Sequence, residues 1–408
     1  MRILIVTNKV PYPAKDGGAI ATLNMALGLA SHGASITVLA INTLKHFSPL
    51  EEIPNDILKR VGIKAATVDT SIKLWPALKN LLFSRKPYIS VRFENKAFLN
   101  LLQKEVTTMP YDIIQLEGPY LEAYMKTIRT YSTAPIVLRA HNIEHEIWDR
   151  TVTITSNPLK KRYLKILAKR IERLEINTLR RVDAVIPITK KDAQSLLKWS
   201  PTIPCHIAPT GLNEAQFTTT NSHKIEQSLF HLGGLDWTPN QAGLIWFLNN
   251  CWPAIRAAVP TAIFFVAGRH APKAFVKAIQ QLGVVFMGEV ENAQLFMQTH
   301  GIMVVPLLSG SGMRIKIIEG MAASTPIVST SIGAEGIEAV SGKDIVIANT
   351  PGAIVEACIL LLLNVELANQ IAKNGCNFAQ QHFNNDEISH KVMEFYQSLL
   401  LERNNKSN

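Results

Sequence analysis

The stretch Val304–Ser331, VVPLLSGSGMRIKIIEGMAASTPIVSTS, decides the fold class of this chain. It begins with an apolar, β-prone run and continues through a loop of small residues, Ser309–Gly312, into a segment with helical spacing that opens at about Met313. A second β-prone run follows. Strand, loop, helix and strand in this order predict a βαβ unit of a parallel sheet.

Two cations stand where this helix is expected to begin. Arg314 and Lys316 fall in its first turn, although helix N-termini favour acids because their free N–H groups are positive. A phosphate would account for both side chains. Glu319 follows one turn later among apolar residues. A carboxylate in such surroundings needs donors, and the two hydroxyls of a ribose would supply them. The alternative is a solvated helix face on which Lys316 pairs with Glu319.

Apolar strands alternate with helices along the whole chain. The expected strands are Arg2–Thr7, Ser35–Ile41, Asp112–Leu116, Pro135–Ala140, Ala184–Ile188, Ser228–Leu232, Ala262–Ala267, Val284–Met287 and Ile302–Val305. This alternation predicts an α/β fold with parallel sheets and right-handed crossovers.

The polar loop Pro209–Lys224 marks a domain boundary, because the βαβ pattern restarts after it. We therefore predict two doubly wound, Rossmann-like domains, residues 1–210 and 225–385, and a last helix, residues 386–402, that crosses back to the first domain. Ligands of such sheets bind at the carboxyl ends of the strands. The two domains are accordingly expected to face each other across a cleft.

The composition is that of a soluble globular protein, with 47% hydrophobic and 18% charged residues. The 4 cysteines are far apart and include no C-x-x-C pair, which favours a reducing compartment and disfavours a structural zinc site. The N-terminal MRILIVTN is typical of a first strand, and apolar runs such as Ile359–Leu363 are too short to span a bilayer. We expect a cytoplasmic protein whose access to a membrane is from its surface.

Positive charge is concentrated in the first half of the chain. The net charge is +10 overall, and residues 1–190 carry +12. The densest segment, Lys160–Arg181, holds nine cations and two acids. Its apolar stripe at helical spacing comprises Tyr163, Ile166, Leu167, Ile171 and Leu174. Such a helix is either a solvated surface helix or a contact for anionic lipid or a lipid-phosphate acceptor. Nucleic acid is disfavoured, because the sequence has no zinc-finger or RNP pattern.

The loop after the first strand ends in Gly17 and Gly18. Paired glycines at the start of a helix allow a ligand to approach the backbone closely, although a plain helix-opening turn explains them equally well. A second polar segment, Arg139–His145, follows the strand Pro135–Ala140. The carboxyl end of a buried strand is where this architecture places an active site.

His141, Glu144 and His145 also match the H-x-x-E-H pattern of zinc peptidases. That motif needs a helix with both histidines on one face, whereas this segment begins directly after a strand. Zinc is therefore a minor alternative here, and a loop with satisfied polar groups is another.

Common cofactor motifs are missing from the sequence. The third glycine of G-x-G-x-x-G, counted from Gly310, would fall on Ile315, and no G-x-x-x-x-G-K-[ST] occurs. No Asp-x-Asp pair occurs either, so a carboxylate-held metal that bridges a diphosphate has no support. We predict no cofactor and no metal, with diphosphate charge met by Arg314, Lys316 and helix N-termini.

Across essentially its whole length, the chain resembles the family 4 retaining glycosyltransferases of the GT-B fold. The segments that carry the resemblance, in the family's order, are Gly17-Gly18, His141, Pro209–Asn213, Gly233–Trp237, Ala267-Gly268, Phe286–Val290, Gly310–Lys316 and Glu319–Ala322. The sequence departs from the family twice. Ser311 stands where the first of two glutamates is often found, and the loop Leu235–Asn240 lacks the cation that many members carry there.

The resemblance implies a metal-independent retaining enzyme that uses a nucleotide-diphosphate sugar. Arg314 and Lys316 would hold the diphosphate, Glu319 would bind the ribose, and His141 would position the donor sugar. The other implied donor-binding residues are Gly17, Gly18, Gly211, Gly268, Met287, Val290, Ser311 and Gly312. The first domain would bind the acceptor, and its positive charge predicts an anionic saccharide or lipid-linked acceptor in cell-surface polysaccharide or glycoconjugate synthesis.

Two other functions are compatible with the same residues. One is a GT-B-related nucleotide-sugar epimerase, which would change the donor without an acceptor. The other is a non-catalytic protein that binds a sugar nucleotide or a membrane surface, for which the Ser311 position is the one favourable feature.

Overall fold

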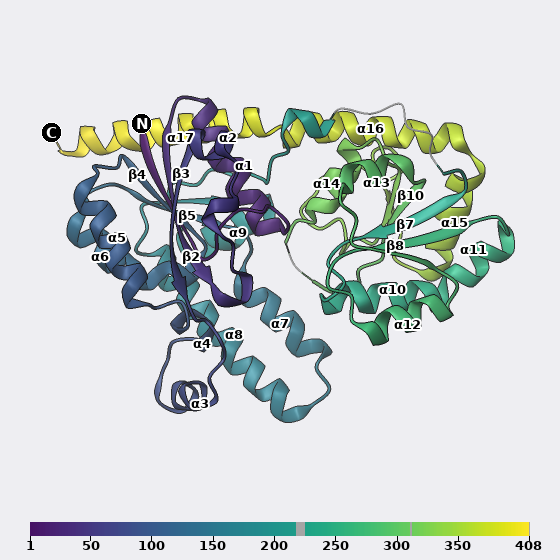
Figure 1. Cartoon of the computed structure of the whole chain (residues 1–408), viewed down its shortest axis with the longest axis horizontal. Helices are drawn as coiled ribbons and strands as arrows, with labels where there is room; N and C mark the ends of the chain where they lie inside the picture. The colour runs from purple at the N-terminus through teal and green to yellow at the C-terminus, as the bar shows by residue number, and fades with distance from the viewer. Residues whose placement is uncertain (218–224, 311, 408) are drawn as a thin grey trace. The chain divides into compact units, whose positions relative to one another are not determined.

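The computed structural model describes residues 1–217, 225–310 and 312–407. The chain divides into two compact units (Figure 1). The first unit is Met1–Gly211 together with Asn385–Asn408, and the second is Leu212–Asn384. The chain therefore leaves the first unit within the loop 209–224 and returns to it where the last helix begins.

The first unit is built on a six-stranded sheet in the order β3-β2-β1-β4-β5-β6. Its strands are β1 (Arg2–Thr7), β2 (Ser35–Thr43), β3 (Val61–Val68), β4 (Ile113–Glu117), β5 (Ile136–Ala140) and β6 (Ala184–Pro187). Each neighbouring pair is parallel. The helices around it are α1 (Gly17–Ser31), α2 (Asn55–Arg60), α5 (Lys96–Thr108), α6 (Met125–Tyr131), α9 (Lys190–Trp199) and α17 (Asn385–Ser407), with a 3-10 turn, η3, at Pro119–Tyr124.

The last helix completes the core of the first unit. Tyr396 of α17 is fully buried in one apolar cluster with Met25 and Leu29 of α1 and with strand residues. The two helices touch so closely that a Cβ on Gly28 would lie 1.9 Å from the Oγ of Ser389. A glycine at position 28 is therefore a packing requirement of the α1–α17 contact.

The second unit is built on another six-stranded parallel sheet, in the order β12-β11-β10-β7-β8-β9. Its strands are β7 (Ser228–Leu232), β8 (Ile263–Ala267), β9 (Val285–Gly288), β10 (Ile302–Val305), β11 (Ile327–Ser329) and β12 (Val346–Ile347). Its helices are α10 (Thr238–Asn250), α11 (Trp252–Ala258), α12 (Lys273–Gln281), α13 (Ala293–Thr299), α14 (Ile315–Ala322), α15 (Pro351–Leu363) and α16 (Val365–Phe383). In the described part of the chain no single helix is long and apolar enough to cross a membrane, and only α15 and α16, bent by 105°, pass that test as a pair.

Both sheets have the same doubly wound order, so the predicted α/β class with two Rossmann-like sheets is confirmed. Strand order reverses between β1 and β4 in the first unit and between β7 and β10 in the second. Loops that leave the carboxyl ends of these strands diverge and create the crevice in which such folds bind ligands. We therefore expect each unit to bind its ligand at these ends.

Several boundaries differ from the prediction. The strand expected to end at Leu116 continues to Glu117, and α14 begins at Ile315, two residues later than expected, with Arg314 as its N-cap. Strand β3 was not predicted, because it is a sheet edge with alternating exposed and half-buried residues. Its polar positions weaken the apolar pattern of the other strands.

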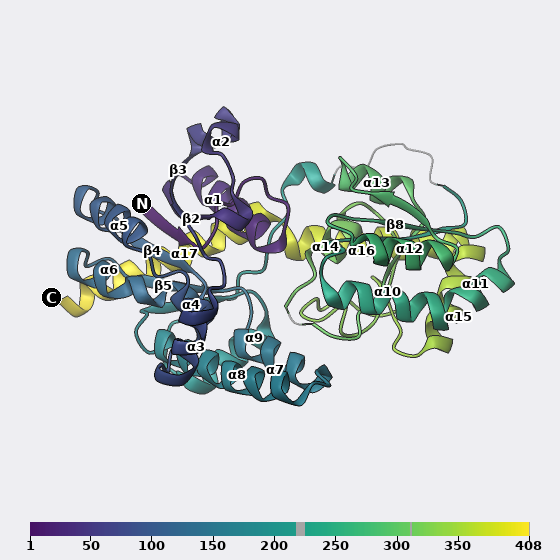
Figure 2. The ribbon, with the colours of Figure 1, turned by 60° about the horizontal axis from the view of Figure 1, so that its bottom comes forward.

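A helical extension projects from the sheet of the first unit (Figures 1 and 2). It consists of α3 (Leu74–Phe83), α4 (Tyr88–Val91), α7 (Glu144–Ile154) and α8 (Pro158–Leu179). The predicted basic helix is α8, but most of its apolar stripe faces inward: Leu167 and Ile171 are buried against Val152 and Trp148 of α7. Of the predicted stripe only Tyr163 and Ile166 stay substantially exposed, at 40% and 39%. The stripe is therefore mainly a packing surface.

Candidate active site

Arg314 lies at the N-terminus of α14, on the chain that leaves β10. Its buried guanidinium donates from Nη1 to the Gly312 carbonyl oxygen at 2.8 Å and lies 5.1 Å from the centre of the Trp237 ring. A Cβ on Gly310, whose φ is +129°, would lie 2.4 Å from the Nη2 of Arg314. Loop and ring together hold the guanidinium at the helix N-terminus, where the backbone is already positive.

Lys316 is held by two neutral groups. Its Nζ donates to the Oδ1 of Asn240 at 3.1 Å and to the Nε2 of His231 at 3.2 Å. His231 can accept there because its Nδ1 donates to the Val304 carbonyl oxygen at 2.9 Å. Burial, and then the charge of Lys316, lowers the pKa of His231 well below its usual value, which keeps the ring neutral.

The Lys316 ammonium has no carboxylate partner among the residues that the structure describes. The alternative of a surface pair with Glu319 is therefore wrong. Burial, and then the charge of Arg314, lowers the pKa of Lys316 to about 7. Two cations near each other in a partly dry site destabilise one another, and an anion between them would remove that cost.

Glu319 follows one turn into α14 and is partly buried. Within the described residues its carboxylate makes no hydrogen bond, and burial raises its pKa to about 7. An ionised carboxylate in this position is costly until donors reach it. The geometry is that expected for a group that accepts hydrogen bonds from a ligand.

The predicted base-reading segment lies at the carboxyl end of β9. The Met287 side chain is 46% exposed there, and Val290 follows in the next loop. Gly268 directly follows β8 with φ +157°, and its amide donates to the Gly288 carbonyl oxygen at 2.8 Å. A Cβ on Gly268 would lie 1.8 Å from the Gly233 carbonyl oxygen, so this glycine lets the loops after β7 and β8 touch.

Two other predicted donor-binding residues, Ser311 and Gly211, have no observed role in donor binding. Ser311 lies outside the residues that the structure describes, so its contact with the sugar remains a prediction. Gly211 packs against the start of α17, where a Cβ would lie 2.6 Å from the Cα of Asn385. This packing is a sufficient reason for glycine there, and it is independent of any donor contact.

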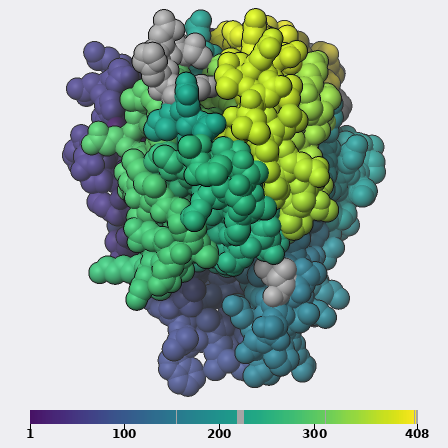
Figure 3. Space-filling model, turned by 90° about the vertical axis from the view of Figure 1, so that its right-hand side faces the viewer, coloured from purple at the N-terminus to yellow at the C-terminus, as the bar shows by residue number. Residues whose placement is uncertain are grey.

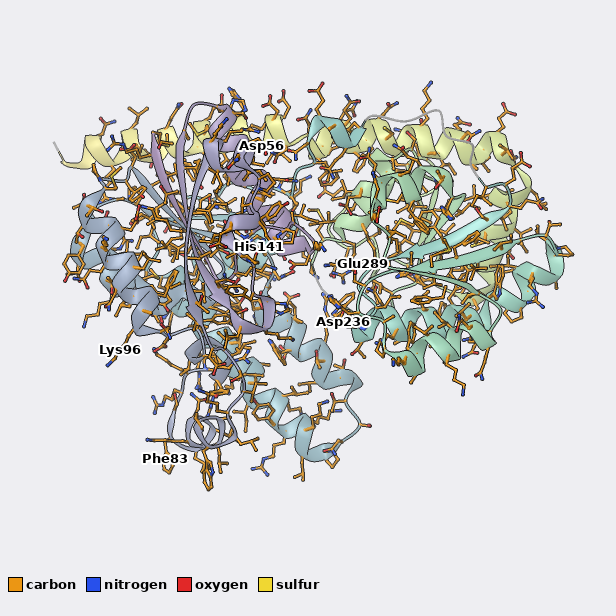
Figure 4. All side chains as sticks on the ribbon, in the orientation of Figure 1. Asp56, Phe83, Lys96, His141, Asp236 and Glu289 are labelled. Carbon is orange, nitrogen blue, oxygen red and sulfur yellow. The ribbon has the colours of Figure 1, made fainter. Side chains whose placement is uncertain are left out.

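In the first unit, His141 follows β5 at the carboxyl edge of the sheet (Figure 4). Its Nε2 lies 2.6 Å from the Oε2 of Glu117, the last residue of the neighbouring strand β4. Burial alone would raise the pKa of Glu117, but the charges of Arg139 and His141 more than offset it and lower the pKa to about 2. The carboxylate can therefore only accept, so the Nε2 of His141 carries a proton and donates.

Glu117 is a candidate site residue that the sequence analysis did not name. Its Oε2 also accepts from the Oγ1 of Thr22 at 2.9 Å and lies 3.7 Å from the Nη1 of Arg139. Gln115 donates to its other oxygen and accepts in turn from the Tyr396 hydroxyl. The available signal was a pair of polar residues at alternate positions of a buried strand, which need partners.

The N-terminus of α1 carries Gly17 and Gly18, as predicted, but it is already capped. The Oδ1 of Asp16 accepts from the Ala19 amide at 3.1 Å and pairs with Lys9. Partial burial would raise the pKa of Asp16, but Lys9 and the backbone donors lower it overall. A phosphate near the Gly18 amide would be repelled by the Asp16 carboxylate and attracted by Lys9. The predicted contact is therefore a weaker anion site than the N-terminus of α14, where both side chains are cations.

The H-x-x-E-H segment begins a helix, and its two histidines have different carboxylate partners. Glu175 of α8 accepts from the amides of Glu144 and His145 at 2.7 and 3.0 Å, and from the Nδ1 of His145 at 2.8 Å. His141 engages Glu117 instead. In residues 1–217, 225–310 and 312–407 no group of three or more His, Cys, Asp or Glu could hold a metal ion.

Comparisons with known proteins bear on the family and the fold of the chain. Residues 226–364 match the family model of glycosyl transferases group 1. Over 406 residues the chain is 22% identical to an uncharacterized 44.6 kDa protein in the cps region of Klebsiella pneumoniae, which covers 96% of this chain and 99% of that protein.

Two solved structures resemble the chain along its length. HepE of Anabaena, in complex with UDP, is 15% identical with a TM-score of 0.67 and covers 98% of this chain and 100% of its own. Sucrose-phosphate synthase from Thermosynechococcus elongatus is 15% identical with a TM-score of 0.74 and covers the same shares, 98% and 100%. The chain therefore has the GT-B fold. Its second unit is a glycosyl transferases group 1 domain, and the protein is a glycosyltransferase.

Proposed function

We propose that the protein is a retaining glycosyltransferase that moves a sugar from a nucleotide-diphosphate sugar to a saccharide or lipid-linked acceptor. The observation that carries this proposal is the pair of cations at the N-terminus of α14. Arg314 is buried there, and the Lys316 ammonium is held by two neutral groups, His231 and Asn240. They lie at the switch point of a doubly wound sheet. HepE, which shares the fold, has been solved with UDP and with UDP-glucose.

In the proposed reaction the bond between the sugar and the diphosphate breaks, and negative charge develops on the departing phosphate. Arg314, Lys316 and the α14 backbone amides would stabilise that charge. No metal is needed for this step, because the cations are supplied by the chain itself. Lys316, whose pKa is lowered to about 7, would be fully protonated once a diphosphate is bound, since an adjacent anion favours the charged form.

The remaining groups orient the donor. Glu319 would accept hydrogen bonds from the ribose hydroxyls, which supply the donors that the described chain does not. His141 donates from Nε2 to Glu117, so Nδ1 is the ring nitrogen that remains for a sugar hydroxyl. The acceptor hydroxyl would attack from the face that the diphosphate leaves and pass its proton to a phosphate oxygen, which preserves the anomeric configuration.

The acceptor is proposed to be anionic and to belong to cell-surface polysaccharide or glycoconjugate synthesis. The net charge of +12 on residues 1–190 supports an anionic partner. The similar Klebsiella pneumoniae protein is described as lying in the cps region. A cytoplasmic enzyme at the inner face of a membrane, with no nucleic-acid partner, fits this acceptor.

Binding and turnover test the proposal in sequence. Thermal unfolding is measured with UDP-, GDP- and ADP-sugars, and one of them is expected to raise the unfolding temperature. Release of nucleotide diphosphate from that donor is then followed with and without acceptor. If none of the donors binds, the proposal is wrong. If the donor alone is epimerised, the protein is an epimerase, and if it binds without reacting under any condition, it is a binding protein.

A further inference from the structure

The helix α3 presents an apolar face to solvent that the proposed reaction does not use. Its inner residues Ala77, Asn80 and Leu81 face α8. Arg170 of α8 ties it down by donating to the carbonyl oxygens of Asn80 and Leu81 at 3.3 and 2.7 Å. The outer residues are Leu74, Trp75, Leu78, Leu82 and Phe83, exposed by 84%, 82%, 46%, 64% and 82%.

This apolar patch is continuous and fixed. Leu74, Leu78 and Leu82 follow one another at four-residue spacing on one helix face. Phe83 ends the helix at the lower edge of the first unit (Figure 4). With Trp75, the patch exposes apolar area on the order of several hundred Å², which in soluble proteins marks an interaction surface.

Cations surround the patch. Lys73, Lys79, Arg85 and Lys86 lie on or beside α3, and Lys160, Arg162, Lys165, Lys169 and Arg173 are exposed on α8. Lys73 pairs with Asp69 at 3.2 Å and Lys86 with Glu94 at 2.7 Å. Lys79 and Arg85 have no acidic partner in the part of the chain that the structure describes. Figure 3 shows residues near 80 and near 160 at the same lower edge of the molecule.

An open hollow adjoins the patch between α8 and the loop after α3. Four cations line it: Arg85, Lys86, Arg170 and Arg173. The one acid in its lining, Glu122, is already paired with Arg181. A phosphate group fits such a set, because guanidinium forks match phosphate oxygens.

We propose that α3 docks this protein on a bilayer that contains anionic lipid. Trp75, Phe83 and the outer leucines enter the boundary between headgroups and acyl chains, and the surrounding cations contact lipid phosphates. A second copy of the chain would bring the same positive charges and be repelled. A nucleic acid would leave the leucines without a partner. The apolar contact comes from α3, because most of the stripe of α8 is buried against α7, and α8 contributes charge.

The proposal is tested by flotation of the full chain with vesicles of phosphatidylcholine alone and of phosphatidylcholine with phosphatidylglycerol. The protein is expected to float with the anionic vesicles only, and less well as salt is raised. The variant Trp75→Ala/Phe83→Ala is expected to lose binding at least ~10-fold, since each aromatic side chain removes a large apolar area from water. The matched control is Leu363→Ala/Val365→Ala, which changes side chains of the second unit that are 62% and 65% exposed.

The electrostatic part has its own pair of variants. Lys79→Glu/Arg85→Glu is expected to weaken binding to anionic vesicles by at least ~10-fold, because each cation near such a surface contributes about 1 kcal/mol. Lys273→Glu/Lys373→Glu makes the same change in charge on exposed residues of the second unit and is expected to leave binding unchanged.

Three outcomes would overturn the proposal. They are the absence of flotation with anionic vesicles, unchanged flotation of Trp75→Ala/Phe83→Ala, and a dimer in analytical ultracentrifugation that this variant converts to a monomer. Membrane docking does not depend on sugar transfer. Nucleotide-induced thermal shifts are expected to be equal in the α3 variants and the wild type, so the failure of one proposal leaves the other intact.

Discussion

The two units have the same strand order and each places a histidine near its switch point, but the histidines have opposite partners. In the first unit, His141 donates to the ionised carboxylate of Glu117 at 2.6 Å. In the second, His231 accepts from the ammonium of Lys316 at 3.2 Å. The shared topology determines where each histidine lies, and its hydrogen-bond partner determines whether the ring donates or accepts.

This difference assigns the roles of the two units. The hydrogen bond to Glu117 fixes the orientation of the His141 imidazole, and a fixed polar group of this kind is suited to a neutral sugar. His231 and Asn240 hold Lys316 without neutralising it, so its charge remains available to a ligand. In the proposed function, a diphosphate would therefore bind to the second unit. The variants below remove one side of the comparison at a time.

The largest effect is expected from Arg314→Ala, which removes a buried cation from the diphosphate site. Turnover is expected to fall by ~100-fold or more, because a charged donor aimed at the developing charge contributes about 2–4 kcal/mol. The measurement is kcat with saturating donor, and Lys273→Ala is the control for loss of a cation elsewhere in the unit. A fall within about threefold would exclude the role assigned to Arg314.

The second effect concerns the first unit. Glu117→Gln keeps the shape of the side chain but removes the anion that sets the proton on His141. Turnover is expected to fall on the order of tenfold to a hundredfold, as it does when a catalytic group is misplaced, while nucleotide binding is unchanged. The control is Thr22→Val, which removes one hydrogen bond from Glu117 and retains the charge. A variant with a lower unfolding temperature and normal kcat would show that Glu117 is only structural.

Glu117 also makes a prediction about acid stability. Its pKa is lowered from 4.5 to about 2 in the folded chain. A carboxyl with a depressed pKa stabilises the fold above its unfolded pKa, and this contribution is lost as the pH falls from about 4.5 towards 2. The unfolding temperature of the wild type is therefore expected to fall more steeply in this window than that of Glu117→Gln.

Local patterns carried most of what could be predicted. The βαβ units and the cations Arg314 and Lys316 are recognised from neighbouring residues, so the sheets and the position of the two cations at a helix N-terminus were predictable. Long-range partners were not predictable. Lys316 contacts His231 and Asn240, which lie 85 and 76 residues away in the sequence. Glu117 was missed for the same reason, because its partner His141 lies 24 residues further along the chain, just after β5.

The second property that the sequence could not predict was which apolar helix face is exposed to solvent. Periodicity showed that α8 has an apolar stripe, but periodicity does not show what covers a stripe. In the structure α7 covers much of it, and the uncovered apolar face belongs to α3. A single sequence contains no signal that separates these two helices.

The third effect is a pH dependence of nucleotide affinity with two limbs: one group makes the affinity rise with pH, and the other makes it fall. Lys316, with its pKa lowered to about 7, loses its charge above that pH, so phosphate binding weakens as the pH rises. Glu319, with its pKa raised to about 7, is ionised above that pH and accepts from the ribose more strongly. Each limb has a slope of up to about tenfold in affinity per pH unit.

The two limbs are separated by substitution. Lys316→Arg stays charged at every pH in this range and is expected to retain only the rise with pH, whereas Glu319→Gln is expected to retain only the fall. Calorimetric titration with nucleotide diphosphate across pH 7 makes the measurement. A flat profile in the wild type would show that neither group faces the ligand.

The smallest effect is expected from Glu319→Gln at fixed pH. Loss of the anionic acceptor is expected to weaken binding of a ribonucleotide about tenfold, because such hydrogen bonds contribute roughly 1–1.5 kcal/mol. Binding of the 2′-deoxy analogue changes less, because that ligand already lacks one donor. The same variant is expected to be more stable without ligand. The gain grows as the pH rises from about 4.5 to about 7 and is complete above that, since the partly buried wild-type carboxyl has a raised pKa in the folded chain. Equal losses for both nucleotides would place Glu319 away from the ribose and leave the stability gain as its only consequence.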